Sequence, residues 1–344
     1  MLLSDFQPRS QLVTKTTMVN KPRFPVIDAH NHLSETFGGG WINKPLPELL
    51  ELLDEVGITT FVDLDGGWGE DVLNEHLEYI KAKAPERFQV FGGVDWSQWE
   101  NKGNGFPEWA ASRLQIQKAR GAQGLKIWKN FGLHVRDNKG DLVKVDDPRL
   151  IPIWETAGEL GLPVMIHVAD PVAFFEPVDA TNERLEELQA HPDWVFTSPP
   201  FPSFISIVES LANLVTRHPK TTFIGAHVGC YAENLAWVGV LLDRCPNFFV
   251  DISARLGELG RQPYTARRFL LQYADRILFG SDMGPDPHTY RIYFRFLETD
   301  DEYFNYSTDI TPQQGRWYVH GLYLPDDVLQ KVYSGSARRV LEME

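Results

Sequence analysis

The strongest constraint on the fold is an alternation, repeated along nearly the whole chain, between short apolar runs and amphipathic segments. Each apolar run is rich in β-branched or aromatic residues and leads into polar or glycine-rich residues, as a strand does when it enters a loop. Eight such runs occur, at residues 25–33, 59–67, 88–95, 122–130, 163–170, 221–229, 248–254 and 276–284. Helical patterns lie between several of them, at residues 46–57, 70–85, 107–120 and 148–161. This order predicts βαβ units and a parallel sheet.

Two α/β architectures compete for such a pattern. An open, doubly wound sheet usually carries a glycine-rich phosphate turn after its first strand, but residues 31–36 contain no glycine. Eight alternations favour a closed (β/α)8 TIM barrel. We therefore expect one barrel domain over residues 24–344, preceded by an N-terminal extension at residues 1–23.

Two connections are longer than a barrel requires. One follows the fifth apolar run, from residue 170 to about residue 218, and the other follows the eighth, from residue 284 to about residue 323, and is dense in aromatic residues. Both leave the carboxyl ends of strands, where barrel enzymes place their sites, so they are candidate pocket walls or lids. The aromatic connection is an equally good candidate for a subunit interface, and hence for a homodimer.

Composition excludes several classes of protein. With 43% hydrophobic residues the 344-residue chain can bury a large core, and no apolar run is long enough to cross a bilayer. A formal charge of −14 disfavours nucleic acid and favours a small-molecule partner. The first residues lack the apolar core of a secretory signal, which predicts a cytoplasmic protein. Cys230 and Cys245 are expected to be free thiols.

Polar residues with metal-binding side chains recur at the carboxyl ends of the predicted strands. In a closed barrel these ends converge on one mouth, so residues far apart in sequence surround one pocket. Several imidazoles and a carboxylate buried together would be costly without a cation. Histidine and carboxylate ligands suit Zn(II) first, with Mn(II) and Fe(II) as alternatives. The residues are His30, His32, Lys126, His167, His227 and Asp282.

This set resembles the amidohydrolase superfamily of metal-dependent barrels. The resemblance rests on the His-x-His of the first run, the histidines that close the fifth and sixth runs, and the aspartate of "FGSD" in the eighth. It covers roughly residues 24 to 341. The most similar branch is the amidohydrolase-related family, which includes aromatic-acid decarboxylases such as aminocarboxymuconate semialdehyde decarboxylase, besides lactone and amide hydrolases.

The resemblance implies roles for single residues. His30, His32, His167 and Asp282 match metal ligands, and His227 matches either a ligand of two-metal members or a residue that polarises the substrate. Lys126 matches a lysine that is carboxylated and bridges two metals in some members; here it could instead meet a substrate carboxylate. The branch usually holds one ion, so we expect one.

The expected activity is hydrolysis of a small amide, lactone or ester, with Asp282 as general base for a metal-activated water and His227 as oxyanion stabiliser. The alternative is non-oxidative decarboxylation of an aromatic or unsaturated acid by the same residues, and a lesser alternative is an inactive metal-binding barrel. Trp128 and Arg255 join Lys126 as candidates for binding a substrate that bears a carboxylate. Asp65 and Asp95 are candidate partners of the histidines.

Overall fold

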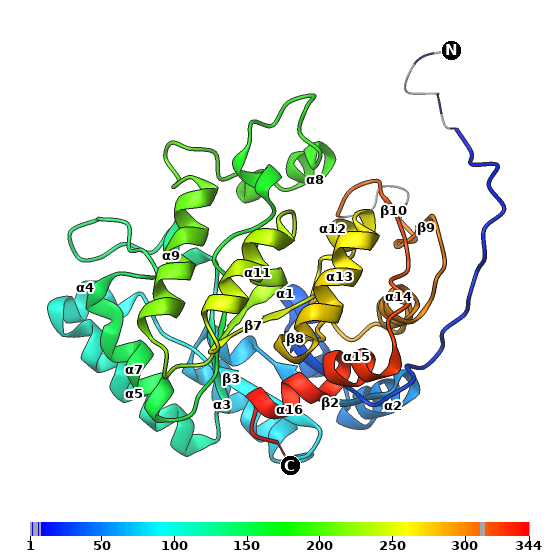
Figure 1. Cartoon of the computed structure of the whole chain (residues 1–344). Coiled ribbons are helices and arrows are strands. Elements are labelled where there is room, and N and C mark those ends of the chain that lie inside the picture. Colours follow the sequence, from blue (N-terminus) through cyan, green and yellow to red (C-terminus); the bar gives the residue numbers. More distant parts are fainter. Residues whose placement is uncertain (1, 3–5, 7, 310–313, 344) are drawn as a thin grey trace.

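The centre of the molecule is a sheet of eight parallel strands that pair in sequence order (Figure 1). The computed structural model describes the chain apart from residues 1, 3–5, 7, 310–313 and 344. The Ala29 amide of the first strand donates to the Phe279 carbonyl after the last, so the sheet closes. Each predicted run contains one strand, and the (β/α)8 barrel is confirmed. The strands are β1 Val26–Asn31, β2 Ile58–Asp63, β3 Phe88–Gly92, β4 Gly124–Ile127, β5 Val164–Ile166, β6 Phe223–Gly225, β7 Phe248–Asp251 and β8 Ile277–Leu278.

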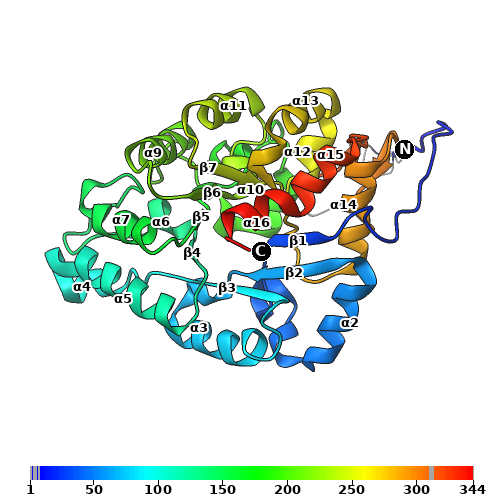
Figure 2. The ribbon, with the colours of Figure 1, turned by 60° about the horizontal axis from the view of Figure 1, so that its bottom comes forward.

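Helices surround the barrel (Figure 2). The longer ones are α2 Leu46–Val56, α3 Glu70–His76, α5 Phe106–Arg120, α7 Ile151–Glu159, α9 Phe204–Arg217, α11 Leu235–Arg244, α13 Pro263–Tyr273 and α14 Pro287–Glu298. The shorter ones include α1 Glu35–Gly38, α4 Gln98–Lys102, α8 Leu185–Ala190, α12 Leu256–Arg261, α15 Asp326–Gln330 and α16 Ser336–Val340. All four predicted helical segments overlap a helix.

The sequence of α9 shows why such segments form helices. The Ser203 hydroxyl accepts from the Ser206 amide at 3.3 Å and caps the first turn. Ile207, Leu211 and Leu214 follow at three- or four-residue spacing and are buried against the outside of the barrel. Glu209 and Asn213 between them face solvent, while Ser210 is buried and donates to the Ser206 carbonyl at 2.8 Å. A single apolar stripe therefore fixes which side of the helix packs.

The strands carry two separate layers of core. Along β5, Val164 and Ile166 belong to the large cluster packed under the helices, while Met165 belongs to a smaller cluster inside the barrel. This alternation follows from the two-residue period of a strand. Ala337 and Val340 of α16 join the inner cluster, and Figure 2 shows α16 crossing the end of the barrel that faces away from the long connections.

Strand β1 changes face before it reaches its histidines. Ile27 and Ala29 belong to the inner cluster, and the register with β2 shifts between Asp28 and Asn31. Within this shifted stretch His30 also lies on the inner side, while the Asn31 side-chain amide donates to Asp28 Oδ2 at 2.8 Å. A bulge of this kind re-aims side chains next to functional sites.

The two long connections gather at the upper end of the barrel in Figure 1. The first holds α8 and leads into α9; the second holds α14 and then an antiparallel pair, β9 Phe304–Asn305 and β10 Tyr318–Val319. The predicted N-terminal extension covers residues 1–23, of which residues 1, 3–5 and 7 lie outside the described part of the chain. We propose that residues 8–23 form an arm outside the barrel domain. In it the Thr17 amide and hydroxyl donate to Asp301 at 2.6 and 2.7 Å.

Cys230 and Cys245 are free and buried, as predicted. Among the described residues, no helix has the length and apolar character that spanning a membrane requires. The cytoplasmic location and the homodimer stay predictions.

Candidate metal centre

Three side chains from the two strands that close the barrel meet at its upper mouth. The ligand atoms of His30, His32 and Asp282 all lie within 4.8 Å of one another. His32 Nε2 is 3.1 Å and His30 Nε2 is 3.7 Å from Asp282 Oδ1. His227, at the end of β6, places Nε2 3.5 Å from Asp282 Oδ2. Asp282 is therefore the common neighbour of three imidazoles.

Each of these histidines is oriented through its other ring nitrogen. His30 Nδ1 donates to Asp251 Oδ2 at 2.9 Å, and His32 Nδ1 donates to Asp65 Oδ1 at 2.8 Å. His227 Nδ1 donates to the Ser253 carbonyl at 2.9 Å. These oxygens can only accept, so each Nδ1 carries a proton, and in the neutral form of each ring the Nε2 turned toward Asp282 can offer a lone pair to a cation. Metal-ligating histidines are held in this way.

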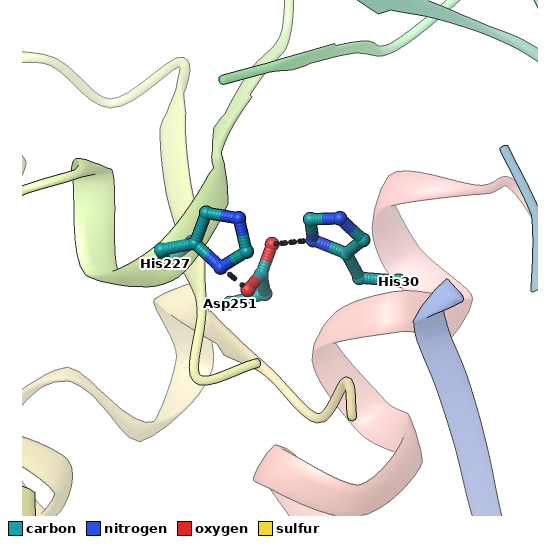
Figure 3. Close-up of side chains that lie close together, drawn as sticks. All are labelled: His30, His227 and Asp251. Atoms are coloured by element: carbon teal, nitrogen blue, oxygen red, sulfur yellow. Dashed lines mark hydrogen bonds and ion pairs between the residues drawn. The ribbon is translucent and has the colours of Figure 1, made fainter. Parts of the chain in front are cut away.

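Asp251 ties two of the histidines together (Figure 3). Besides its bond to His30, its Oδ1 accepts from the backbone amide of His227 at 3.1 Å. The Ser253 hydroxyl lies 2.9 Å from His30 Nδ1 and 3.3 Å from His227 Nδ1. Asp251 and Ser253 are two residues apart along β7 and its extension, and this spacing puts both side chains on the inner face of the barrel.

Of the two predicted carboxylate partners, only Asp65 contacts a histidine. Asp95 was the other candidate, and that prediction is wrong. It is exposed, and its carboxylate accepts from Ser97 and Gln98 in a local turn. The strand that precedes it ends early, at Gly92, so Asp95 lies in the following loop.

The electrostatics keep Asp282 ionised. Burial would raise the pKa of its carboxyl, but His30, His32 and His227 outweigh burial and hold that pKa well below its ordinary value. For His32 the effects are reversed: burial lowers the pKa of the imidazole, but hydrogen bonds and charge from Asp282 and Asp65 raise it to about 9. His227 is different, because burial and the charge of Arg255 leave its pKa well below the ordinary value. Its Nε2 is therefore an acceptor.

The backbone is strained at two of these positions. His227 has φ 56° and Asp282 has φ 55°, in the left-handed region that non-glycine residues seldom occupy. Gly280 makes room nearby, since a Cβ on it would lie 2.8 Å from His30 Cβ. Such strain concentrates at functional sites, where the surroundings hold it in place.

His167 lies beside the cluster without belonging to it. Its ring stands edge-on to that of His227, with centroids 4.4 Å apart. Its Nε2 is buried without a hydrogen-bond partner among the described residues, although Asp170 Oδ1 is 3.4 Å away. Lys129 Nζ contacts the other oxygen of Asp170 at 2.5 Å. An orphaned buried nitrogen next to three imidazoles fits a position that a cation completes.

The Lys129–Asp170 pair gives a test of acid stability. Burial would raise the pKa of Asp170, but Lys129 and His167 outweigh it and hold that pKa well below its ordinary value. A carboxyl whose folded pKa is depressed stabilises the fold above its unfolded pKa, about 4, and loses that contribution as pH falls. We expect Asp170→Asn to lower the free energy of unfolding at pH 7 by about 1–3 kcal/mol.

The difference between wild type and Asp170→Asn should shrink as the pH is lowered from 5 to 3, as measured by urea unfolding at each pH. Asp193→Asn removes an exposed carboxylate from the same connection. In this control the free energy of unfolding should fall with decreasing pH as it does in the wild type. A difference that stays constant, or one that grows on acidification, would contradict the assigned pair.

The predicted substrate-binding residues surround the cluster on two sides. Lys126 is 1% exposed, and its Nζ lies 3.2 Å from His30 Nε2. Burial lowers the pKa of this amine. The Arg255 side chain is buried on the side of His227, and its Nη1 donates to the Ala254 carbonyl at 2.7 Å. Two cationic groups therefore flank the donors.

Aromatic rings form a wall on the side of His32. Trp128 stacks on His32 with centroids 5.1 Å apart, and Trp68 stacks on Trp128 at 3.9 Å. The ring centroid of Phe37 lies 5.7 Å from that of His32 and 6.2 Å from that of Trp128. Phe37 and Trp68 are about half exposed, so the wall reaches the surface.

The donor set fits a divalent cation. Three Nε2 atoms and a carboxylate face one another, and each of these imidazoles is fixed by an acceptor on its far side. Mixed nitrogen and oxygen donors of this kind suit Zn(II), Mn(II) and Fe(II) alike. The orphaned His167 nitrogen provides a further donor at the edge of the group.

Four contributors to this site were not predicted from the sequence: Ser253, Asp170, Phe37 and Trp68. Asp170 had a usable signal, since it follows His167 by three residues at the end of a strand. Ser253 follows Asp251 at the two-residue period of β7. Phe37 lies in the short helix α1 and Trp68 ends a 3-10 turn at Asp65–Trp68, and both elements are too short for a periodic pattern that would relate them to a barrel face.

A model of an amidohydrolase family matches residues 27–343. A search of curated proteins finds no match. The family match covers nearly the whole barrel and every donor described above.

Solved structures share the fold at low identity. A 2,6-dihydroxybenzoate decarboxylase from Rhizobium has 18% identity and a TM-score of 0.58 over 93% of this chain and 99% of that chain. A dihydroxybenzoic acid decarboxylase from Polaromonas sp. JS666, with bound manganese and the inhibitor 2-nitroresorcinol, has 19% identity and a TM-score of 0.56 over 93% and 97%. A 5-carboxyvanillate decarboxylase from Sphingomonas paucimobilis has 16% identity and a TM-score of 0.55 over 88% and 84%.

Proposed function

Because the chain belongs to the amidohydrolase family, we propose that it is a metal-dependent enzyme that removes the carboxyl group of an aromatic acid as CO2. Decarboxylation, which was the alternative in the sequence analysis, is thus preferred to hydrolysis. The three similar structures named above are decarboxylases of aromatic acids, and one holds manganese.

The observation that carries the proposal is the aromatic wall beside the donors. Trp128 and Trp68 offer stacked, planar surfaces next to His32. A planar ring packs on such a surface better than a tetrahedral or flexible substrate does. Lys126 and Arg255 supply positive charge for an anionic substrate on the other sides. The metal centre thus has one flat aromatic wall and two cationic side chains beside its donors, as an aromatic carboxylate requires.

A divalent cation held by His30, His32, His167 and Asp282 would supply a positive charge that draws the substrate's oxygens into the site. Trp128 would hold the ring plane, and Lys126 or Arg255 would bind the carboxylate. Asp282, ionised at rest, would accept a proton from a substrate hydroxyl or from water. When the bond between ring carbon and carboxyl breaks, its electron pair stays on the carbon, and Asp282 returns the proton there.

The proposal is tested by measuring CO2 release from a panel of hydroxybenzoates, including 2,6-dihydroxybenzoate and 5-carboxyvanillate, with protein loaded with Mn(II) or Zn(II). We expect release from at least one acid, and none with the Asp282→Asn variant. Acid release from lactones or amides without any CO2 would replace the proposal by hydrolysis. Metal binding without turnover on either panel would favour the inactive barrel.

Substitution of the aromatic wall should change substrate affinity more than turnover. In Trp128→Leu, loss of the stacked face should raise KM for an aromatic acid about 2- to 10-fold and change kcat less. The measurement is steady-state kinetics with metal content checked in parallel. Trp237→Leu, on the outer helix α11, is the control and should keep the wild-type KM. An unchanged KM in Trp128→Leu would remove Trp128 from the substrate pocket.

Hydrolysis remains a second candidate because one observation favours it. The second oxygen of Asp282 lies 3.5 Å from His227 Nε2, which is an acceptor. The two groups together form a proton-accepting pair of the kind that activates water for attack on an amide or lactone. The same substrate panels distinguish it from decarboxylation.

A further inference from the structure

A second hollow lies at the end of the barrel away from the metal centre, beside α16 (Figure 2). This basal cavity encloses about 500 Å³ between the segment at residues 157–163, the residues that lead into β6 and β7, and α16. The amino ends of parallel barrel strands lie opposite the mouth where sites of catalysis form. None of the metal donors described above lines the cavity, and its volume is within the range of pockets that bind small molecules.

The charges that line the basal cavity are mostly positive. Lys220, Arg276 and Arg339 contribute cations, against a single carboxylate, that of Glu342. The whole chain has a formal charge of −14, so this local excess of cations runs against its composition. Glu342 is exposed, and in the described part of the chain no carboxylate forms an ion pair with any of these three cations. Their charges are therefore not offset by a neighbouring acid.

Arg276 is held in place by neutral acceptors. Its Nη2 donates to the carbonyls of Cys245 and Phe248, where β7 begins. Its Nη1 has no hydrogen-bond partner among the described residues and, unlike Nε, is not sealed off from solvent. Burial and the nearby charge of Arg339 lower the pKa of this guanidinium, which nevertheless stays protonated at neutral pH. Arg276 thus keeps its full charge and has a free donor.

Arg339 approaches the same place from α16. Its guanidinium carbon lies 5.2 Å from the centroid of the Phe249 ring, and that of Arg276 lies 4.8 Å from it. Arg339 Nη2 donates to the Asp275 carbonyl, while the Asp275 carboxylate contacts Lys331 Nζ at 3.1 Å. Two guanidiniums beside one ring repel each other, and an anion that contacts both relieves this repulsion.

We propose that the basal cavity binds a phosphate group, free or as part of a small molecule, which is held by Arg276 and Arg339 with Lys220 at the rim. A phosphate monoester carries a charge of about −1.5 to −2 at neutral pH and three acceptor oxygens, so it suits several unpaired cations better than a carboxylate does. Guanidinium donors match phosphate oxygens in pairs. Leu162 and Val340 line the apolar side of the cavity, where the rest of a phosphorylated molecule would pack.

The test is isothermal titration of the metal-loaded protein at constant ionic strength, with n-butyl phosphate and inorganic phosphate as probes and n-butanol as the neutral counterpart. We expect saturable binding of the phosphates and none of n-butanol; tighter binding of n-butyl phosphate would identify an ester as the ligand, and equal binding would identify free phosphate. Arg339→Gln should weaken binding about tenfold or more. Arg268→Gln, which removes an exposed arginine of α13 outside the cavity, should leave binding within about twofold.

Butyrate tests the preference for phosphate. With a single charge it should bind at least about fivefold more weakly than n-butyl phosphate, judged by the part of its binding that Arg339→Gln removes. Equal affinity of the two would overturn the assignment to phosphate.

Arg339 is exposed, so its variant should fold. Thermal unfolding without probe checks this, and Lys220→Gln at the rim replaces the variant if it does not fold. Absence of saturable binding of both phosphates to the wild type would overturn the proposal. Equal binding to wild type and Arg339→Gln would also overturn it, and loss of binding in Lys126→Gln would then place the phosphate at the metal centre.

Discussion

Replacing Asp282 by asparagine should reduce turnover by about a thousandfold or more while the barrel stays folded. The carboxylate is the common neighbour of His30, His32 and His227. Both proposed reactions need a group there that accepts a proton and returns it, and an amide cannot do so. The side-chain oxygen of asparagine can still accept from His32, so the surrounding structure has little reason to change. The measurement is kcat for the best substrate of the panels, with circular dichroism and metal content beside it.

Asp95→Asn is the matched control for this variant. Asp95 is a carboxylate that follows strand β3, but it is exposed and engaged in its own turn. It should retain wild-type kcat. If Asp282→Asn kept turnover within about tenfold with metal still bound, the proton would have to move through another group. His227→Gln would then identify whether that group is His227, whose Nε2 lies 3.5 Å away.

The barrel was predictable because its signal repeats. Each strand is a short run between polar residues, and the order of eight runs and intervening helices leaves few topologies once parallel pairing is accepted. The carboxyl ends of parallel strands must then share one end of the barrel, which is why His30 and Asp282 could be placed together from opposite ends of the sequence. Closure itself supplied the contact between β1 and β8.

The partners of the histidines were harder to predict. That His30 bonds to Asp251, 221 residues away, depends on the angle at which β7 faces β1 across the barrel. The bulge in β1 also has no signature in "DAHNH", yet it decides that Ala29 and His30 both face inward. The prediction for Asp95 was wrong because β3 ends at Gly92, three residues before the carboxylate, which then lies in an exposed turn.

His167 shows the difference between predicting a residue's strand position and predicting its contacts. Its place at the end of β5 followed from the pattern, but its distance from the other donors did not. Its ring stands edge-on to that of His227, and Lys129 holds the Asp170 carboxylate beside it. Strand position places each side chain at the mouth of the barrel, but side-chain rotation decides which donors meet, and the sequence pattern does not give that rotation.

Removing His30 should remove the bound metal, and the stoichiometry should identify the role of Lys126. We expect one equivalent of metal per chain in the wild type and less than about a tenth of that in His30→Ala, because one ligand is lost and Asp251 loses its partner. Elemental analysis of protein purified without chelator measures both the amount and the identity of the ion, which decides among zinc, manganese and iron. His191→Ala, which removes an exposed histidine, should keep the full equivalent.

Lys126→Gln discriminates between the two states proposed for that lysine. An unmodified Lys126 only approaches His30, with Nζ 3.2 Å from Nε2, so the variant should keep one equivalent of metal and lose affinity for an anionic substrate. A carboxylated lysine would bridge two ions, so the wild type would hold two equivalents and Lys126→Gln fewer. That outcome would contradict the one-ion centre, and it would favour hydrolysis over decarboxylation because paired ions clamp the attacking and leaving oxygens. A wild type that binds no metal even after reconstitution with Zn(II) or Mn(II) would show that the three imidazoles and Asp282 serve another purpose.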